Sequence, residues 1–223
     1  MQTIILAAGE GLRMRPLTLT VPKTLIEIKG KPIISYIMET LPHEVDEVIV
    51  VVRYHSEKIR DYLGFSFGGR GIVYVEGSGR GTAADFLLTQ PYVESDRFLL
   101  VYGDELPRSD DVGNCLKHEF SVLVFRSNNP TAHGIVILSD DGLVEGIVEK
   151  PEDPPSEIAI DGVMVLGRKM FEYKPVSGRG GEFYLTSLVD RFVKDHIVHP
   201  VMSVGFLGDI TTPADIARIE RLL

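Results

Sequence analysis

Length, composition and charge set the first limits on this chain. Its 223 residues are 44% hydrophobic and 25% charged, as in a globular protein that can bury a sizeable core. The net charge of −9 argues against nucleic acid as a partner, and apolar runs such as residues 48–52 are far too short to span a membrane. The single cysteine, Cys115, excludes an internal disulfide and fits a reducing compartment, so we expect a cytoplasmic protein.

The first half of the chain alternates between short apolar strands and helices. The opening strand has no basic segment before it and runs directly into glycines, so we do not expect a signal peptide. Strands are predicted at residues 3–8, 47–52, 71–76, 97–102 and 121–125, and helices at residues 33–41, 55–63 and 83–88. Near-continuous apolar strands that alternate with helices indicate a parallel sheet covered on both faces. The sequence therefore predicts an α/β fold of three layers, α/β/α, with a Rossmann-like and mainly parallel sheet.

The pattern changes after residue 130. Residues 135–138 and 144–148 flank Ser-Asp-Asp-Gly and predict a β-hairpin, and a further strand is expected at residues 159–166. A helix is predicted over residues 182–194, and a last helix begins at Thr212, followed by a proline and by an acid at the third position. The simplest interpretation is one domain with a sheet-rich second half.

The segment after the first strand is rich in glycine and arginine. It reads Leu6-Ala7-Ala8-Gly9-Glu10-Gly11-Leu12-Arg13-Met14-Arg15-Pro16-Leu17-Thr18. It is not a dinucleotide fingerprint, because Met14 stands where a small residue is needed, and no Gly-Lys-Ser/Thr follows at P-loop spacing. Pro16 also prevents a helix from starting normally. The segment is therefore either a loop that binds a polyphosphate through backbone amides and cations, or a surface turn with solvated arginines.

Several motifs together resemble one enzyme family. The opening segment, followed by Pro22-Lys23 and Gly30-Lys31-Pro32, resembles the sugar-1-phosphate nucleotidylyltransferases, with Leu12 in place of a usual threonine. Later stretches resemble that family's motifs in the same order; they are Gly81-Thr82-Ala83, Tyr102-Gly103-Asp104, Glu149-Lys150-Pro151, Asp161-Gly162-Val163, Gly181-Glu182-Phe183-Tyr184-Leu185-Thr186 and Gly208-Asp209-Ile210-Thr211-Thr212-Pro213. Ser187 and Thr211 depart from the family's usual aspartate and glycine. Molybdopterin and methylerythritol nucleotidyltransferases share only part of the opening.

The resemblance implies an activity and a set of site residues. A nucleoside triphosphate and a sugar 1-phosphate would react by in-line attack on the α-phosphate, giving a nucleotide-sugar and pyrophosphate. The implied catalytic cations are Arg13 and Lys23, and the implied ligands of Mg²⁺ are Asp104 and Asp209. The implied nucleotide-binding residues are Leu6, Ala8, Gly9, Gly11, Glu76, Gly81 and Thr82. The implied sugar-phosphate-binding residues are Gly134, Glu149, Lys150, Gly162 and Glu182.

The resemblance also divides the chain. Residues 1–129 would form the nucleotide-binding part and residues 130–223 the sugar-phosphate-binding part of a single nucleotidyltransferase domain. The chain ends just after its last predicted helix, so we expect no C-terminal β-helix of the kind that bifunctional relatives carry. Neither nucleic acid nor membrane is expected as a partner, and a homo-oligomer stays open.

The base and the sugar also stay open. In the family, a glutamine before the Gly-Thr-Ala turn often meets the base, and Glu76 stands near that place. An ionised glutamate only accepts hydrogen bonds, which suits the two adjacent donors of guanine. GTP with mannose 1-phosphate is therefore as reasonable as UTP or dTTP with glucose 1-phosphate.

Two other classes of function compete with this one. A regulatory subunit of the same family without activity would have no chemical need to keep Arg13, Lys23, Asp104 and Asp209 together. A glycosyltransferase of similar architecture would need an Asp-x-Asp motif, which Gly103-Asp104-Glu105-Leu106 lacks.

Other polar residues are expected to be structural. His196 and His199 have the spacing of metal ligands, but His199 precedes a proline outside any helix, which argues against zinc. Arg53, Arg60 and Arg70 are interpreted as surface charges.

Overall fold

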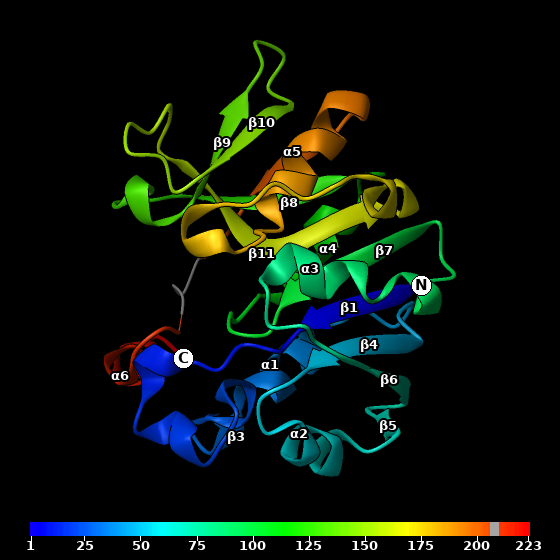
Figure 1. Ribbon diagram of the computed structural model, residues 1–223, viewed down its shortest axis with the longest axis vertical. Coiled ribbons are helices and arrows are strands. Elements are labelled where there is room, and N and C mark those ends of the chain that lie inside the picture. The colour runs from blue at the N-terminus through cyan, green and yellow to red at the C-terminus, as the bar shows by residue number, and fades with distance from the viewer. Residues whose placement is uncertain (206–209) are drawn as a thin grey trace.

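A mixed sheet of ten strands forms the centre of the molecule (Figure 1). The computed structural model describes residues 1–205 and 210–223. Four strands of the sheet run parallel, in the order β7-β1-β4-β6. Their bounds are β1 Gln2–Leu6, β4 Glu47–Val52, β6 Arg70–Glu76 and β7 Arg97–Tyr102. The predicted Rossmann-like parallel sheet is therefore confirmed.

Antiparallel strands extend this sheet on the side of β7. The long strand β11 (Ile158–Gly167) pairs antiparallel with β7 and also with β8 (Ser121–Arg126) and β9 (Gly134–Leu138). The predicted hairpin is formed by β9 and β10 (Val144–Glu149), which lie at the top of Figure 1. The remaining strands are short; they are β2 (Glu27–Ile28) with β3 (Lys31–Pro32) in a separate ribbon, β5 (Ser66–Phe67) beside β6, and β12 (His199–Met202) parallel to β8.

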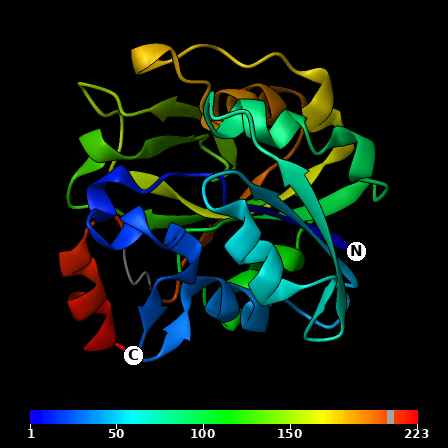
Figure 2. The same cartoon turned by 60° about the horizontal axis from the view of Figure 1, so that its bottom comes forward.

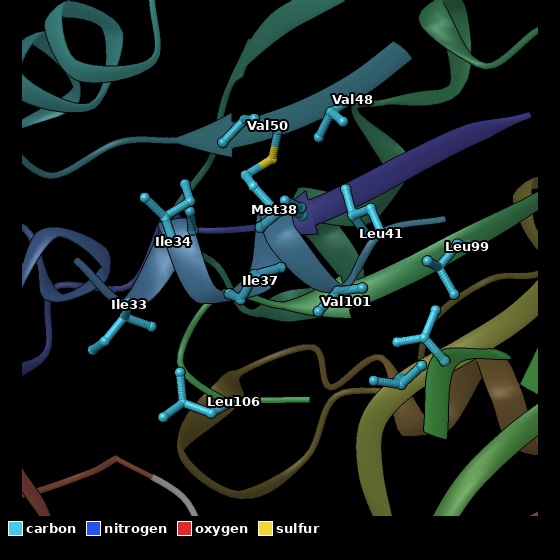
Figure 3. Packing of buried hydrophobic residues seen from close by; sticks show 14 of the residues in the cluster. Ile33, Ile34, Ile37, Met38, Leu41, Val48, Val50, Leu99, Val101 and Leu106 are labelled. Atoms are coloured by element: carbon cyan, nitrogen blue, oxygen red, sulfur yellow. The ribbon is translucent and has the colours of Figure 1, made fainter. Parts of the chain in front are cut away.

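Helices cover both faces of the sheet. One face packs against α1 (Ile33–Thr40), α2 (Ser56–Leu63), α4 (Ser109–Leu116) and α6 (Pro213–Glu220), and the other against α3 (Thr82–Leu87) and α5 (Thr186–Asp195). Successive strand residues point to opposite faces, so Val48 and Val50 join the first cluster while Ile49 and Val51 join the second. Figure 3 shows α1 seated on Val48 and Val50 of β4 and on Leu99 and Val101 of β7. Helices on both faces of the central sheet give the predicted three-layer α/β/α arrangement.

The last helix packs against a segment from the early part of the chain. Helix α6 lies beside the β2–β3 ribbon in both views (Figures 1 and 2), and the backbone N–H of Lys29 donates to Glu220 Oε1 at 3.1 Å. The predicted start of this helix is confirmed, since Thr212 and Asp215 form a capping box. Among the described residues, no helix is long and apolar enough to cross a membrane.

One helix begins later than predicted. Residues 182–185 lie before α5, which starts at Thr186. They are held in an extended turn, in which Ser177 bridges to Phe183 and the N–H of Gly178 donates to the carbonyl of Glu182 at 2.8 Å. Gly180 and Gly181 supply the positive φ angles of that turn, which a helix cannot accommodate. Helix α4 and strand β12 were not predicted.

Candidate active site

A cavity of about 770 Å³ lies where the carboxyl ends of β1 and β7 meet. The chain passes from β1 to β4 and β6 on one side, while β7 lies on the other side of β1. Such a reversal of strand order leaves a crevice beyond the carboxyl ends of the strands, the usual ligand site of open α/β sheets. The residues after β1 and β7 form one wall, and the start of β9 and the end of β10 form the opposite wall.

Most of the predicted site residues line this one cavity. They are Leu6, Ala8, Gly9, Gly11, Arg13, Lys23, Gly81, Thr82, Asp104, Gly134, Glu149, Lys150 and Glu182. Residues that are as much as 176 positions apart in the sequence, such as Leu6 and Glu182, thus reach one space.

Three predicted residues are not among those that line the cavity. Glu76 is exposed, and its carboxylate pairs with Arg60 at 3.4 Å. The backbone N–H of Gly162 donates to Glu105 Oε2 at 2.6 Å and to Asp161 Oδ1 at 2.7 Å, so two carboxylates already occupy it. Asp209 lies outside the described residues.

An ion pair lies within the wall formed by the residues after β1 and β7. Lys23 Nζ lies 2.6 Å from Asp104 Oδ2, and only 10% of the lysine side chain is exposed, against 42% for the aspartate. Lys23 follows Pro22 in a short 3-10 turn, while Asp104 follows β7. The pair thus joins the loop after β1 to the end of β7, and Asp104 keeps a face toward the cavity.

Close contact of two backbones fixes the position of Asp104. The N–H of Gly103 donates to the carbonyl of Leu6 at 3.0 Å, and a Cβ atom at Gly103 would lie only 2.8 Å from that oxygen. No larger residue fits there without moving the end of β7 away from β1. The glycine before Asp104 therefore holds the carboxylate at the strand end.

Side-chain contacts organise the opposite wall. Glu149 ends β10, and its Oε2 accepts a hydrogen bond from the hydroxyl of Thr186 at 2.8 Å. Its Oε1 lies 3.4 Å from Lys150 Nζ, which also lies 4.9 Å from the centre of the Tyr184 ring. Glu149 and Lys150 are therefore held as a pair at the cavity wall by residues around the start of α5.

Three hydrogen bonds, together called the clasp, join the start of α5 to the start of α3. The N–H of Phe183 donates to the carbonyl of Arg80 at 2.9 Å, and the carbonyl of Phe183 accepts from the N–H of Ala83 at 2.8 Å. The N–H of Leu185 donates to the hydroxyl oxygen of Thr82 at 2.8 Å. Residues 183–185 are thus bonded directly to the turn that starts α3.

Comparison with known proteins decides the family. A family model described as nucleotidyl transferase matches residues 2–201. This chain belongs to the nucleotidyl transferase family. It is 35% identical to the bifunctional protein GlmU of Methanocaldococcus jannaschii, in an alignment that covers all of this chain and 54% of that protein. The chain therefore spans about half the length of this relative, and the same holds for several similar ones.

Two further relatives match over most of their own length. One is the UTP–glucose-1-phosphate uridylyltransferase AglF of Haloferax volcanii, which is 27% identical over all of this chain and 96% of that protein. The other is a crystal structure from Bacillus anthracis, of a candidate glucose-1-phosphate thymidylyltransferase in complex with sucrose. It superposes with a TM-score of 0.86 at 25% identity and covers all of this chain and 94% of the other.

Within this nucleotidyl transferase, the cavity also holds residues that the sequence did not single out. Arg53 was expected to be a surface charge, and this expectation is wrong, because Arg53 lines the cavity and pairs with Glu10. Tyr184, Thr186 and Thr211 line it as well. The position of Arg53 immediately after β4 was the available signal, since the carboxyl ends of parallel strands meet at one edge.

Burial raises the pKa values of one tyrosine that lines the cavity and of the single cysteine. Burial raises the pKa of Tyr102 well above its usual value, and the carboxylates of Glu149, Glu105 and Asp104 raise it further, so the phenol keeps its proton. Cys115 is fully buried in the core, and burial raises the pKa of its thiol to about 12. This thiol is therefore a packing group.

Proposed function

We propose that this chain is a sugar-1-phosphate nucleotidylyltransferase. In the proposed reaction, an oxygen of the sugar phosphate attacks the α-phosphorus of a nucleoside triphosphate, and pyrophosphate leaves from the opposite side. One observation carries the proposal: a single cavity is lined by a glycine- and arginine-bearing loop after β1, by the Lys23–Asp104 pair and by the Glu149–Lys150 pair. The names of the relatives in Haloferax volcanii and Bacillus anthracis support the same reaction class.

On the nucleotide side, the proposed roles follow from charge and backbone geometry. Backbone amides of residues 9–13 would face the triphosphate, and Arg13 would neutralise the charge that develops on the departing pyrophosphate. Lys23, whose ammonium group pairs with Asp104 at the cavity, would lie between the α-phosphate and the incoming sugar phosphate. Gly81 and Thr82 would flank the ribose and base.

On the sugar side, a cation and two carboxylates would bind different groups of the sugar phosphate. Lys150 would bind the phosphate of the sugar, while Glu149 and Glu182 would accept hydrogen bonds from its hydroxyl groups. The hydroxyl of Thr186 orients Glu149 toward this task. Gly134 lines the same wall and leaves space beside Glu149.

The residues fit a magnesium ion next to Asp104. Mg²⁺ needs only one or two protein carboxylates, because phosphate oxygens and water complete its shell. Asp104 presents a half-exposed carboxylate to the cavity, and Asp209 is proposed as the second ligand. Such an ion would neutralise the phosphates.

The substrates most in keeping with the relatives contain uracil or thymine. Of the two pairs left open by the sequence, UTP or dTTP with glucose 1-phosphate has the support of the names of two relatives, while GTP with mannose 1-phosphate has none of this kind. We propose the cytoplasm as the site of action, since both substrates are soluble metabolites. A regulatory role without activity is the alternative.

A pyrophosphate-release assay tests the proposed function. The purified chain is incubated with MgCl₂, with each of GTP, UTP, dTTP, CTP and ATP, and with several sugar 1-phosphates. We expect one combination to release pyrophosphate and to yield a nucleotide-sugar of the matching mass, and we expect EDTA to stop the reaction. Binding of a nucleotide-sugar without any turnover would instead support the regulatory alternative.

A further inference from the structure

We propose that Arg53 and Glu10 together recognise the edge of the nucleotide base. This inference rests on the proposed function and adds a specificity-determining pair to it. Arg53 follows β4, and Glu10 lies in the loop after β1. Their side chains form an ion pair at the cavity wall and are each about one-third exposed, at 35% and 34%.

The hydrogen-bonding groups of this pair suit the edge of a base. Glu10 balances the charge of Arg53, so the pair as a whole carries no net charge. The pair keeps directional hydrogen-bonding groups, because a guanidinium only donates and a carboxylate only accepts. A base edge presents donors and acceptors side by side without a net charge, so the two surfaces are complementary.

Arg53 also keeps unused hydrogen-bonding capacity. Its Nη2 donates to Glu10, while no hydrogen bond from Nη1 or Nε reaches another residue in the described part of the chain. The Nε atom is fully buried and cannot reach a ligand, whereas Nη1 is not fully buried. A ligand that accepts a hydrogen bond from Nη1 would give this unpaired donor a partner.

Gly79 makes room for the guanidinium. A Cβ atom at this position would lie 2.7 Å from Arg53 Cζ and 2.8 Å from Nη1. Arg53 therefore packs flat against the backbone at residue 79 and occupies the volume that a side chain there would fill. At this position the polar group comes from Arg53, because Gly79 has no side chain.

The loop that supports Arg53 is itself well ordered. The carboxylate of Asp85, which is buried at the start of α3, accepts hydrogen bonds from Ser78 N–H at 2.6 Å, from the Ser78 hydroxyl at 2.8 Å and from Gly79 N–H at 3.2 Å. The backbone against which Arg53 packs is thus fixed before any ligand binds. Prior order of this kind is what specificity for one base requires.

The location agrees with the nucleoside end of the substrate. Lys23 and Asp104 mark the proposed reacting centre at the end of β7, and β4 lies two strands away from β7, roughly 10 Å at ordinary strand spacing. Glu76 lies on the next strand, but it pairs with Arg60 and does not line the cavity. The chain therefore carries two neighbouring Arg–Glu pairs, of which one faces the ligand space.

These two pairs provide a test with a matched control. Binding of each nucleoside triphosphate, and of inorganic tripolyphosphate as a probe without a base, is measured by calorimetry on the wild type and on Arg53→Gln, Glu10→Gln, Arg60→Gln and Glu76→Gln. We expect Arg53→Gln to weaken the preferred nucleotide by about 10-fold or more and to reduce the preference among bases, with little change for tripolyphosphate. Glu10→Gln should also alter the preference, and the Arg60 and Glu76 variants should not.

Several outcomes would overturn the inference. Equal weakening of tripolyphosphate would make Arg53 a phosphate ligand, and an unchanged preference among bases would make it structural. A changed preference in Glu76→Gln alone would assign the base to Glu76. Should Arg53→Gln fail to fold by its melting curve, Arg53→Lys answers the same question, because it keeps the charge and loses the planar fork. Base-selective binding without pyrophosphate release would refute the proposed enzyme while leaving the Arg53 result valid.

Discussion

The two walls of the cavity are built by different means. On the wall of parallel strands, backbone groups and glycines set the geometry: Gly103 presses on Leu6, and Gly79 leaves space for Arg53. On the wall of antiparallel strands, side chains hold one another, as Thr186 holds Glu149 and Glu149 holds Lys150. The difference suits the ligands we propose, since phosphates and bases can be met by fixed amides, whereas sugars need individual side chains for individual hydroxyls.

The largest expected effect comes from Lys23, on the wall of parallel strands. Lys23→Ala should lower the turnover number by about 100-fold or more, because it removes a cation from the developing phosphate charge. The measurement is steady-state pyrophosphate release at saturating substrates, with a melting curve as the control, since the buried lysine also neutralises Asp104. An unchanged rate in a folded variant would reduce Lys23 to a structural partner of Asp104.

A second substitution separates the walls by their substrates. Lys150→Ala should raise the KM for the sugar 1-phosphate by about 10-fold or more and leave the KM for the nucleotide nearly unchanged, because a charged hydrogen bond to one phosphate is lost. Kinetics with each substrate varied in turn provide the comparison. Equal increases for both substrates would move Lys150 to the nucleotide side.

A smaller effect should follow from loosening the antiparallel wall. Thr186→Val removes the hydroxyl that donates to Glu149, and we expect a loss in kcat/KM for the sugar 1-phosphate of about 5- to 10-fold, the equivalent of one hydrogen bond. Thr186→Ser keeps the hydroxyl and should restore most of the rate. A Thr186→Val variant with the kcat/KM of the wild type would show that this hydrogen bond contributes nothing to catalysis.

The smallest expected effect concerns α6, which begins shortly after the cavity residue Thr211. Burial opposes ionisation of Asp215, but hydrogen bonds from Thr212 and Thr211 outweigh it and lower its pKa to about 2, from 3.8. A lowered pKa stabilises the folded chain above pH 4, and this stability is lost as the pH falls from about 4 to 2. Asp215→Asn should therefore cost about 1 kcal/mol at pH 7 and flatten the acid limb of the stability curve, as measured by urea unfolding. A variant with an unaltered acid limb would contradict this role.

The sequence predicted elements with strong local patterns better than elements that depend on long-range contacts. Apolar strands and the Thr212 cap have strong local patterns, and the predicted bounds of β4 and β7 agree with the structure. The start of α5 was missed because long-range bonds from Phe183 to Arg80 and Ala83 override a helical spacing. Strand β12 was missed because it is short and contains Pro200, which only an edge or a strand terminus tolerates well.

Prediction of the site residues also failed where long-range contacts decide the outcome. Motifs located the cations and carboxylates, because their chemistry is local to a short stretch. The contrast between Arg53 and Glu76 could not be read in this way, since both come at the carboxyl ends of neighbouring parallel strands. Which of them reaches the cavity depends on the contacts of Arg53 with Gly79 and Glu10 and on those of Glu76 with Arg60, and no local pattern encodes these contacts.

The clasp between residues 183–185 and the turn at Arg80–Ala83 has a thermodynamic consequence. Glu182, on the proposed sugar side, precedes one partner of the clasp, and Gly81 and Thr82, on the proposed nucleotide side, belong to the other. A substrate that shifts one segment while these bonds persist would shift the other, and the two binding equilibria would then be linked. Linkage is reciprocal: if the bound nucleotide changes the affinity for the sugar phosphate by some factor, the bound sugar phosphate changes the affinity for the nucleotide by the same factor.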